Sequence, residues 1–169
     1  MFFRNLCCVL GEYLYYLYGN IRNRIGRLMR LALHTDFALR TLLYLAARSK
    51  RATVGEVAEF YRISAHHLGK VVHQLGKLGY VRNVRGPGGG IELARLPARI
   101  SVGEVIETLE GRNVHLLECV DTPGVCVIQP GCTLRSVLAE AERRQMEYLK
   151  GVTLESLLPA THDIAAFLN

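Results

Sequence analysis

The sequence lacks any long hydrophobic run, because arginine, glutamate or glycine interrupts each apolar stretch of its 169 residues. A helix that crosses a bilayer needs about 20 consecutive apolar residues, so we expect a soluble protein without a membrane span. Intrinsic disorder is also excluded, since 50% of the residues are hydrophobic and 21% are charged, as in chains that bury a core. A chain of this length holds one domain, or one domain with an appendage, which excludes a large multidomain enzyme.

The sequence also lacks an even set of cysteines and a secretory signal. It has five cysteines, and Cys119, Cys126 and Cys132 lie within 14 residues of one another. A cytoplasmic protein with a metal or redox role is favoured over one held together by disulfides.

Acidic residues are scarce in one half of the chain. Residues 29–99 contain 12 lysines and arginines against 4 aspartates and glutamates, whereas residues 100–169 contain 5 against 10. The first half therefore has a net charge of +8 and the second a net charge of −5. Clustered positive charge is typical of a nucleic-acid-binding surface, so we expect double-stranded DNA to bind the basic half.

The first 28 residues differ from the rest of the chain. They contain four of the eight tyrosines and no small-residue cleavage site, so they do not form a signal peptide. A basic, periodic stretch starts directly after Met29. We predict that the native chain starts at Met29 and that residues 1–28 are a leader outside the native domain. The alternative is an amphipathic arm that lies on the surface.

Two helices are predicted at the start of the basic half. Thr35 is expected to cap the first, which runs to about Arg48 and is apolar over most of its circumference, so it should be buried. Thr53 and Glu56 have the spacing of a capping box and predict a second, short helix that ends near Phe60.

A third helix follows after only a few residues, which is the spacing of a helix-turn-helix. Ser64 is expected to cap this helix, which runs to about Leu78. Its first turns carry Ser64, His66, His67 and Lys70, where a recognition helix would meet base edges and phosphates. The alternative for each of these residues is an ordinary solvated helix face.

A glycine-rich turn over residues 85–90 separates two short predicted strands. Glycines let a backbone turn tightly and approach another surface closely. No helix follows the glycines, as a phosphate-binding nucleotide loop would require. We therefore predict a β-hairpin wing, with Arg85 as a candidate for insertion into the minor groove of DNA.

The acidic half contains an irregular segment with three cysteines and then a long helix. Ser101 and Glu104 form another capping-box pattern and predict a short helix before this segment. The long helix is expected over residues 133–150, and its apolar side consists of Leu134, Val137, Leu138, Ala141, Gln145, Met146 and Leu149. An apolar stripe on a protruding helix needs a partner. We predict a homodimer that places two recognition helices on a palindromic site.

The three cysteines favour a metal site, because thiolates are soft ligands and an irregular loop lets their sulfurs converge. The alternative is three buried, inert cysteines. Structural zinc prefers Cys-x2-Cys pairs, which are absent here, so an iron–sulfur cluster is favoured. Such a cluster needs a fourth ligand; His115 is close in sequence, but the ligand need not be local.

These patterns predict a mainly α fold with a small β-hairpin wing. Residues 29–99 are expected to form a winged helix-turn-helix DNA-binding domain, and residues 100–169 a cluster-binding loop with a long dimerisation helix.

Three stretches together resemble the BadM/IscR family of winged-helix iron–sulfur regulators. They are residues 29–31 with the Thr-Asp-Phe-Ala-Leu-Arg sequence of residues 35–40, the Val-Arg-Gly-Pro-Gly-Gly-Gly sequence of residues 84–90, and the cysteine triad. In the IscR branch a histidine three residues after the last cysteine completes the cluster, whereas this chain has Arg135 there. The resemblance is therefore greater to the nitric-oxide-sensing branch of the family.

The resemblance implies a homodimeric repressor with a [4Fe–4S] or [2Fe–2S] cluster, which represses genes for nitric oxide detoxification and leaves its operator when nitric oxide nitrosylates the cluster. It also implies that Cys119, Cys126 and Cys132 bind iron, and that Asp36 reaches the cluster from the other subunit. The alternative for Asp36 is an acid in the first helical turn that the helix dipole stabilises.

Two other functions remain open. A regulator of the same family could respond to iron or cluster supply through the same cysteines. A metal-bearing electron carrier would have no role at DNA and would bind it weakly, without salt dependence. An enzyme is not expected, because no nucleophile, base and orienting group stand at a recognisable spacing.

Overall fold

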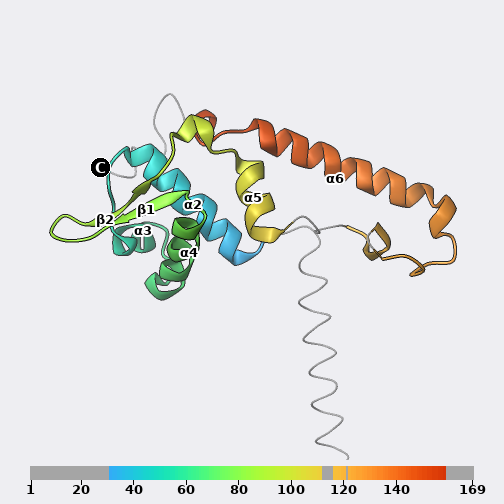
Figure 1. Cartoon of the computed structure of the whole chain (residues 1–169), viewed down its shortest axis with the longest axis horizontal. Helices are drawn as coiled ribbons and strands as arrows, with labels where there is room; N and C mark the ends of the chain where they lie inside the picture. The colour runs from blue at the N-terminus through green and yellow to red at the C-terminus, as the bar shows by residue number, and fades with distance from the viewer. Residues whose placement is uncertain (1–30, 112–115, 121, 159–169) are drawn as a thin grey trace, which may run out of the picture.

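The computed structural model describes residues 31–111, 116–120 and 122–158. Helices α2 (Leu33–Arg48), α3 (Val54–Phe60) and α4 (Ala65–Lys77) come first, and strands β1 (Val81–Val84) and β2 (Gly90–Leu93) follow. Helices α5 (Val102–Glu110) and α6 (Thr133–Gly151) complete the regular structure. Figure 1 shows a body formed by α2 to α5 and the hairpin, from which α6 extends. The mainly helical fold with a hairpin wing is confirmed. The predicted leader, the predicted start at Met29 and the candidate ligand His115 lie outside the described residues.

Helix α2 lies at the centre of the core, in contact with both α4 and α5. Ala38, Leu42 and Leu45 are almost fully buried on it, as the apolar circumference of this helix predicts. The core also contains Leu154, which follows α6 in the chain and is only 1% exposed. Segments from both ends of the described chain therefore share one hydrophobic core.

The start of α2 is set from a distance rather than by a local cap. Ala32 occupies the N-cap position and has no side-chain capping bond, while its backbone N–H donates a hydrogen bond of 2.7 Å to the carboxylate of Glu110. Thr35 lies inside the first turn and is buried. The prediction that Thr35 caps this helix is wrong, because a carboxylate from α5 satisfies the helix start instead.

The helix-turn-helix forms as the local sequence predicts. The Thr53 hydroxyl accepts a hydrogen bond of 3.1 Å from the Glu56 N–H, and the Glu56 carboxylate accepts one of 2.5 Å from the Thr53 N–H. The turn between α3 and α4 places Arg62 in the left-handed region, with φ at 53°. Ser64 occupies the N-cap of α4, although its side chain makes no capping bond.

Strands β1 and β2 pair antiparallel, with Val81 opposite Leu93 and Val84 opposite Gly90. Ala52 exchanges two backbone hydrogen bonds with Ile91, of 3.0 and 2.7 Å, and so forms an isolated antiparallel β-bridge beside β2. Gly90 is required here, since a Cβ at this position would lie 2.5 Å from the carbonyl oxygen of Ala52. The wing is therefore attached to the segment between α2 and α3.

The first turn of α5 packs directly on the last turn of α6. The Ser101 hydroxyl donates to the carbonyl of Lys150 at 2.9 Å, and the Val102 N–H donates to the carbonyl of Val152 at 2.9 Å. A Cβ on Gly103 would lie 2.6 Å from the backbone nitrogen of Lys150. Only glycine allows the two helices to approach this closely. We call this contact the α5–α6 joint.

The capping box predicted at the start of α5 is only half formed. The Ser101 side chain accepts a hydrogen bond of 3.3 Å from the Glu104 N–H. The Glu104 carboxylate instead binds Arg95 and Tyr80. A tertiary partner with a positive charge therefore outcompetes the local backbone N–H for this carboxylate.

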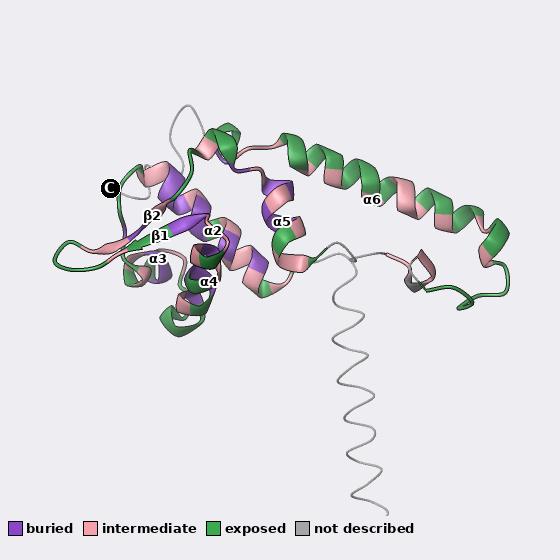
Figure 2. Cartoon of the chain, in the orientation of Figure 1, coloured by how far each residue is buried: buried purple, intermediate pink, exposed green. Residues whose placement is uncertain are grey.

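Helix α6 has no buried residue along its 19 residues. Figure 2 shows this helix in the colours of exposed and intermediate residues, in contrast to the buried faces of α2 and α5. Leu134 and Val137 of the predicted apolar stripe are 59% and 61% exposed. The expected long helix is confirmed. Leu134 and Val137 of its apolar stripe remain exposed within the described chain, whereas Leu138, Met146 and Leu149 are partly covered.

We expect Gly103→Ala to destabilise the protein by about 1–3 kcal/mol, the usual cost of overpacking a close contact. The measurement is urea unfolding followed by circular dichroism. Gly69→Ala in α4 is the matched control, because a Cβ there meets nothing within 4 Å. That control should stabilise the protein by about 0.5–1 kcal/mol through higher helix propensity. Equal stability of the two variants would contradict the close packing at the α5–α6 joint.

Candidate DNA-binding surface and cysteine loop

Helix α4 presents a polar outer face beside a buried inner face. Leu68, Val71, Val72 and Leu75 are buried against the core, whereas Ser64, His66, His67 and Lys70 are all exposed. The four residues predicted to meet DNA therefore lie together at the first turns of the helix. His73 and Lys77 extend the same polar face by two further turns, and their spacing from Lys70 would have predicted this.

The wing is braced by an arginine that the sequence analysis did not identify. Arg51 donates to the carbonyl of Gly88 at 3.1 Å and forms an ion pair of 3.1 Å with Glu92. Glu92 also binds Arg82 across the hairpin. Arg85 lies exposed in the glycine-rich turn. The turn is therefore fixed at its base, while the candidate minor-groove residue remains free to meet another surface.

The charge of Glu92 is stabilised by its neighbours in the wing. The hydrogen bonds from Arg82 and then Arg51 lower the pKa of this carboxyl below its usual 4.5. A carboxyl with a lowered pKa in the folded state stabilises the fold above its unfolded pKa and loses this contribution as the pH falls.

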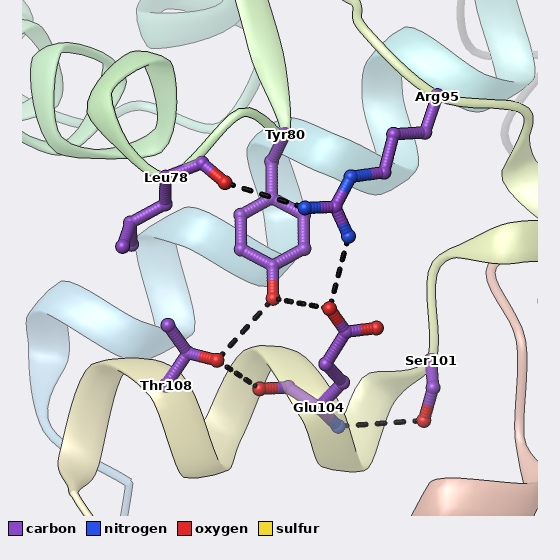
Figure 3. Close-up of polar contacts among 6 residues, drawn as sticks. All are labelled: Leu78, Tyr80, Arg95, Ser101, Glu104 and Thr108. Atoms are coloured by element: carbon purple, nitrogen blue, oxygen red, sulfur yellow. Dashed lines mark hydrogen bonds and ion pairs between the residues drawn. The ribbon is translucent and has the colours of Figure 1, made fainter.

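A polar cluster joins the base of the wing to α5, as Figure 3 shows. The Tyr80 hydroxyl donates to Glu104 at 3.2 Å, and Arg95 binds the same carboxylate oxygen at 2.9 Å. The Arg95 guanidinium also lies 4.7 Å from the centre of the Tyr80 ring. Burial is the main cause that raises the pKa of Tyr80. The Thr108 hydroxyl lies 3.4 Å from that of Tyr80. These contacts link the DNA-binding candidate surface to the α5–α6 joint.

The segment over residues 119–132, which we call the cysteine loop, is irregular as predicted. The short 3-10 helix η2 (Glu118–Val120) overlaps its start, and a second one, η3 (Gln129–Gly131), lies near its end. Its three cysteines form no disulfide; Cys126 is exposed, and Cys119 and Cys132 are partly exposed. The alternative of three buried cysteines therefore does not describe this chain.

The single chain does not gather these cysteines into a metal-binding group. Within residues 31–111, 116–120 and 122–158, no three or more histidine, cysteine, aspartate or glutamate side chains are grouped so that they could hold a metal ion. The chemistry of the donor set nevertheless fits an iron–sulfur cluster, since it offers three accessible, unpaired thiols in one loop. The assignment of Cys119, Cys126 and Cys132 as iron ligands stays a prediction.

Cys132 also occupies the N-cap of α6, where its side chain makes no capping hydrogen bond. The first turn of α6 carries Arg135, which donates to the carbonyl of Val120 at 3.1 Å. Arg135 therefore ties the loop to α6, at the position where the IscR branch has a histidine.

Asp36 lies away from the cysteine loop, in the first turn of α2. Its carboxylate binds Arg40 through two contacts of 2.9 Å. The Arg40 guanidinium in turn lies 5.9 Å from the ring of Tyr61, at the end of α3. Within the described chain, Asp36 thus has the role of a first-turn acid paired with an arginine. Its assignment as an iron ligand stays a prediction that requires a second subunit.

A helix-turn-helix with an exposed second helix and a hairpin wing defines the protein as a winged-helix transcriptional regulator. The chain belongs to the Rrf2 family, whose members are described as iron-dependent transcriptional regulators. The match to this family covers residues 31–160. This finding confirms the resemblance seen in the sequence motifs. Within the described residues, no helix is long and apolar enough to span a membrane.

Relatives of known name support the same class. The chain is 41% identical over 144 residues to the HTH-type transcriptional regulator NsrR of Shouchella clausii, covering 83% of this chain and 96% of that protein. It is also 41% identical to NsrR of Bacillus subtilis, covering 83% and 98%. Among solved structures, the cysteine regulator CymR of B. subtilis has the same fold, with a TM-score of 0.62 at 23% identity over 79% of this chain and 99% of that one. These relatives are regulators and not enzymes.

We expect Glu92→Gln to lower the melting temperature at pH 7, because it removes the ion pairs with Arg51 and Arg82. The difference from the native protein should shrink as the pH falls below about 4.5, where Glu92 in the unfolded chain becomes protonated. Thermal unfolding between pH 7 and pH 3 measures this. Glu59→Gln controls for the loss of one exposed negative charge. A difference that stays constant over this pH range would contradict the role assigned to the carboxylate.

Proposed function

We propose that the protein is a cytoplasmic homodimeric repressor that binds palindromic operators of nitric oxide detoxification genes when it carries an iron–sulfur cluster. The observation that carries this proposal is the set of three free thiols in one loop at the start of α6. This set occurs in a winged-helix chain that is 41% identical to regulators named NsrR. When bound, the cluster would supply a site that reacts with nitric oxide.

Cys119, Cys126 and Cys132 would hold a [4Fe–4S] or [2Fe–2S] cluster, with Asp36 of the partner subunit as the fourth ligand. A hard carboxylate matches a cluster iron poorly, so that iron would exchange its ligand most readily. In the isolated chain, Arg40 already holds Asp36 through two contacts. Release of Asp36 from iron would therefore return it to a partner in its own helix.

The uncovered α6 supports the homodimer. Leu134 and Val137 of its apolar stripe are each more than half exposed. A second copy of the same helix would cover this stripe and relate the two subunits by a two-fold axis. Ser64, His66, His67 and Lys70 of each subunit would then meet the major groove and phosphates of one half-site. Arg85 would enter the minor groove.

The contacts of the chain offer a route from the cysteine loop to the DNA-binding surface. Arg135 ties the loop to α6, and the α5–α6 joint ties the end of α6 to α5. Glu104 of α5 binds Tyr80 and Arg95 at the base of the wing. A change in α6 would thus alter the separation of two recognition helices. Both half-sites must be engaged together, so a small change would lower the affinity strongly.

A regulator that responds to iron or cluster supply is the second candidate. The description of the Rrf2 family as iron-dependent favours it, and the same three thiols would serve it. Exposure of the holo-protein to nitric oxide and, separately, to a chelator distinguishes the two. The proposed repressor loses operator binding at nitric oxide levels that leave a supply sensor unaffected.

We expect Cys132→Ala to lose the cluster and, with it, at least about tenfold in operator affinity, within the usual range of allosteric coupling. The measurements are iron and sulfide content after anaerobic purification, and binding to a palindromic duplex that the native protein selects from a random pool. Ser136→Ala, an exposed change one turn further along α6, is the control. A Cys132→Ala protein with full cluster content and regulated binding would overturn the assignment.

We expect Lys70→Ala to weaken binding to specific and random duplexes alike, because Lys70 is assigned to a phosphate. The slope of log affinity against log salt should become shallower by about 1.8, because the homodimer loses one phosphate contact in each subunit at about 0.9 per contact. Fluorescence anisotropy over a salt series measures the slope. Arg144→Ala, which removes a cation from α6, should leave it unchanged. An unchanged slope for Lys70→Ala would place the DNA elsewhere.

A further inference from the structure

One side chain organises most of the cysteine loop. The Gln129 amide group donates to the carbonyl of Cys119 at 2.6 Å and to that of Thr122 at 2.9 Å. The same side chain accepts a hydrogen bond of 2.7 Å from the Gly124 N–H. Both ends of the amide are therefore used, and three backbone groups between residues 119 and 124 converge on one residue.

The backbone of Gln129 reaches the other two cysteines. Its N–H donates to the carbonyl of Cys126 at 3.1 Å, and its carbonyl accepts from the Cys132 N–H at 3.5 Å. Gln129 thus makes a hydrogen bond to the main chain of all three cysteines. It is also the one amide side chain between Cys119 and Cys132.

Apolar packing does not order this loop. Val125, Val127 and Ile128 are 50%, 99% and 66% exposed, so the loop buries little apolar surface against the core. An irregular segment without such burial must be held by its polar contacts. Among the described residues, the side-chain hydrogen bonds of the loop to its own main chain all come from Gln129.

The geometry points to Gln129 as a positioning residue that holds the loop in the shape from which its three thiols converge on a metal. This inference rests on the proposed function, which assigns the thiols as ligands. Gln129 does not bind the metal: it ties the main chain of Cys119 to that of Cys126 and Cys132. The loop is then largely ordered before the metal binds, which lowers the entropic cost of binding.

The test uses the reduced full-length protein and two variants. Gln129→Ala removes the side-chain bonds, and Gln129→Glu keeps the shape but turns the two donors into an acceptor that faces carbonyl oxygens. Gln145→Ala, at an exposed glutamine of α6, is the matched control. Cys132→Ala sets the level expected for an incomplete set of thiols.

The first readout is amide hydrogen exchange of the metal-free protein. Gln129→Ala should speed exchange at the Gly124 amide at least several-fold and leave the core helices unchanged, whereas Gln129→Glu keeps an oxygen that can accept from this amide. The second readout is Co²⁺ titration followed by the thiolate-to-cobalt absorption band. Both variants should bind Co²⁺ at least about tenfold more weakly than the native protein and Gln145→Ala, as loss of an outer partner of a metal site does.

The two readouts separate the two hypotheses. A native exchange rate at the Gly124 amide of Gln129→Ala, or native Co²⁺ affinity in both Gln129 variants, would overturn the role of Gln129. A native protein without a thiolate–cobalt band would overturn the thiol site itself, and with it the metal role of Gln129. Faster exchange would then show Gln129 as a purely structural clamp.

Discussion

The packing of α5 on the end of α6 is the contact on which the rest of the structure depends. At Gly103 the two backbones approach too closely for any side chain, and the Ser101 hydroxyl satisfies a carbonyl at the end of α6. Helix α6 itself has no buried residue, so this joint and the buried Leu154 after the helix hold it to the body. The position of the cysteine loop relative to the recognition helix therefore depends on the contacts at the C-terminal end of α6.

Charge divides the molecule in the same way as its contacts do. Acids of α6 are paired with arginines of the same helix: Arg143 and Arg144 bind Glu140 and lower its pKa to about 2, and Arg143 also binds Glu147. Residues 29–99, in contrast, contain three times as many lysines and arginines as acids. The half of the chain that contains the helix-turn-helix therefore carries net positive charge, which attracts a polyanion, while α6 remains close to neutral.

The sequence predicted those elements whose bonds lie within a few residues. Thr53 and Glu56 form their capping box three residues apart, and the glycine-rich turn closes a hairpin of adjacent strands. It failed where a distant group competes for the same atom. Glu110 reaches the start of α2 across 78 residues, and Arg95 with Tyr80 takes the Glu104 carboxylate from its local cap. No short-range pattern contains either partner.

The same distinction applies to the candidate site: some of its residues are marked by a sequence pattern and others are not. The residue types that suit DNA and iron could be read from spacing, and the outer face of α4 is exposed as expected. The clamp made by Gln129 could not, because an amide in an irregular loop has no period that marks it. The pairing of Asp36 with Arg40 follows the same rule as the capping box, because residues four apart on a helix lie side by side and can form an ion pair.

Leu154, buried in the core although it follows α6 in the chain, has a consequence for synthesis on the ribosome. The body formed by α2 to α5 is translated before this side chain exists, and until it arrives the core contains a gap of roughly one leucine. Such a gap costs about 2–5 kcal/mol in a finished protein. A nascent chain that stops within α6 therefore lacks the side chain that fills this part of the core, and we expect its body to be less stable by about this amount.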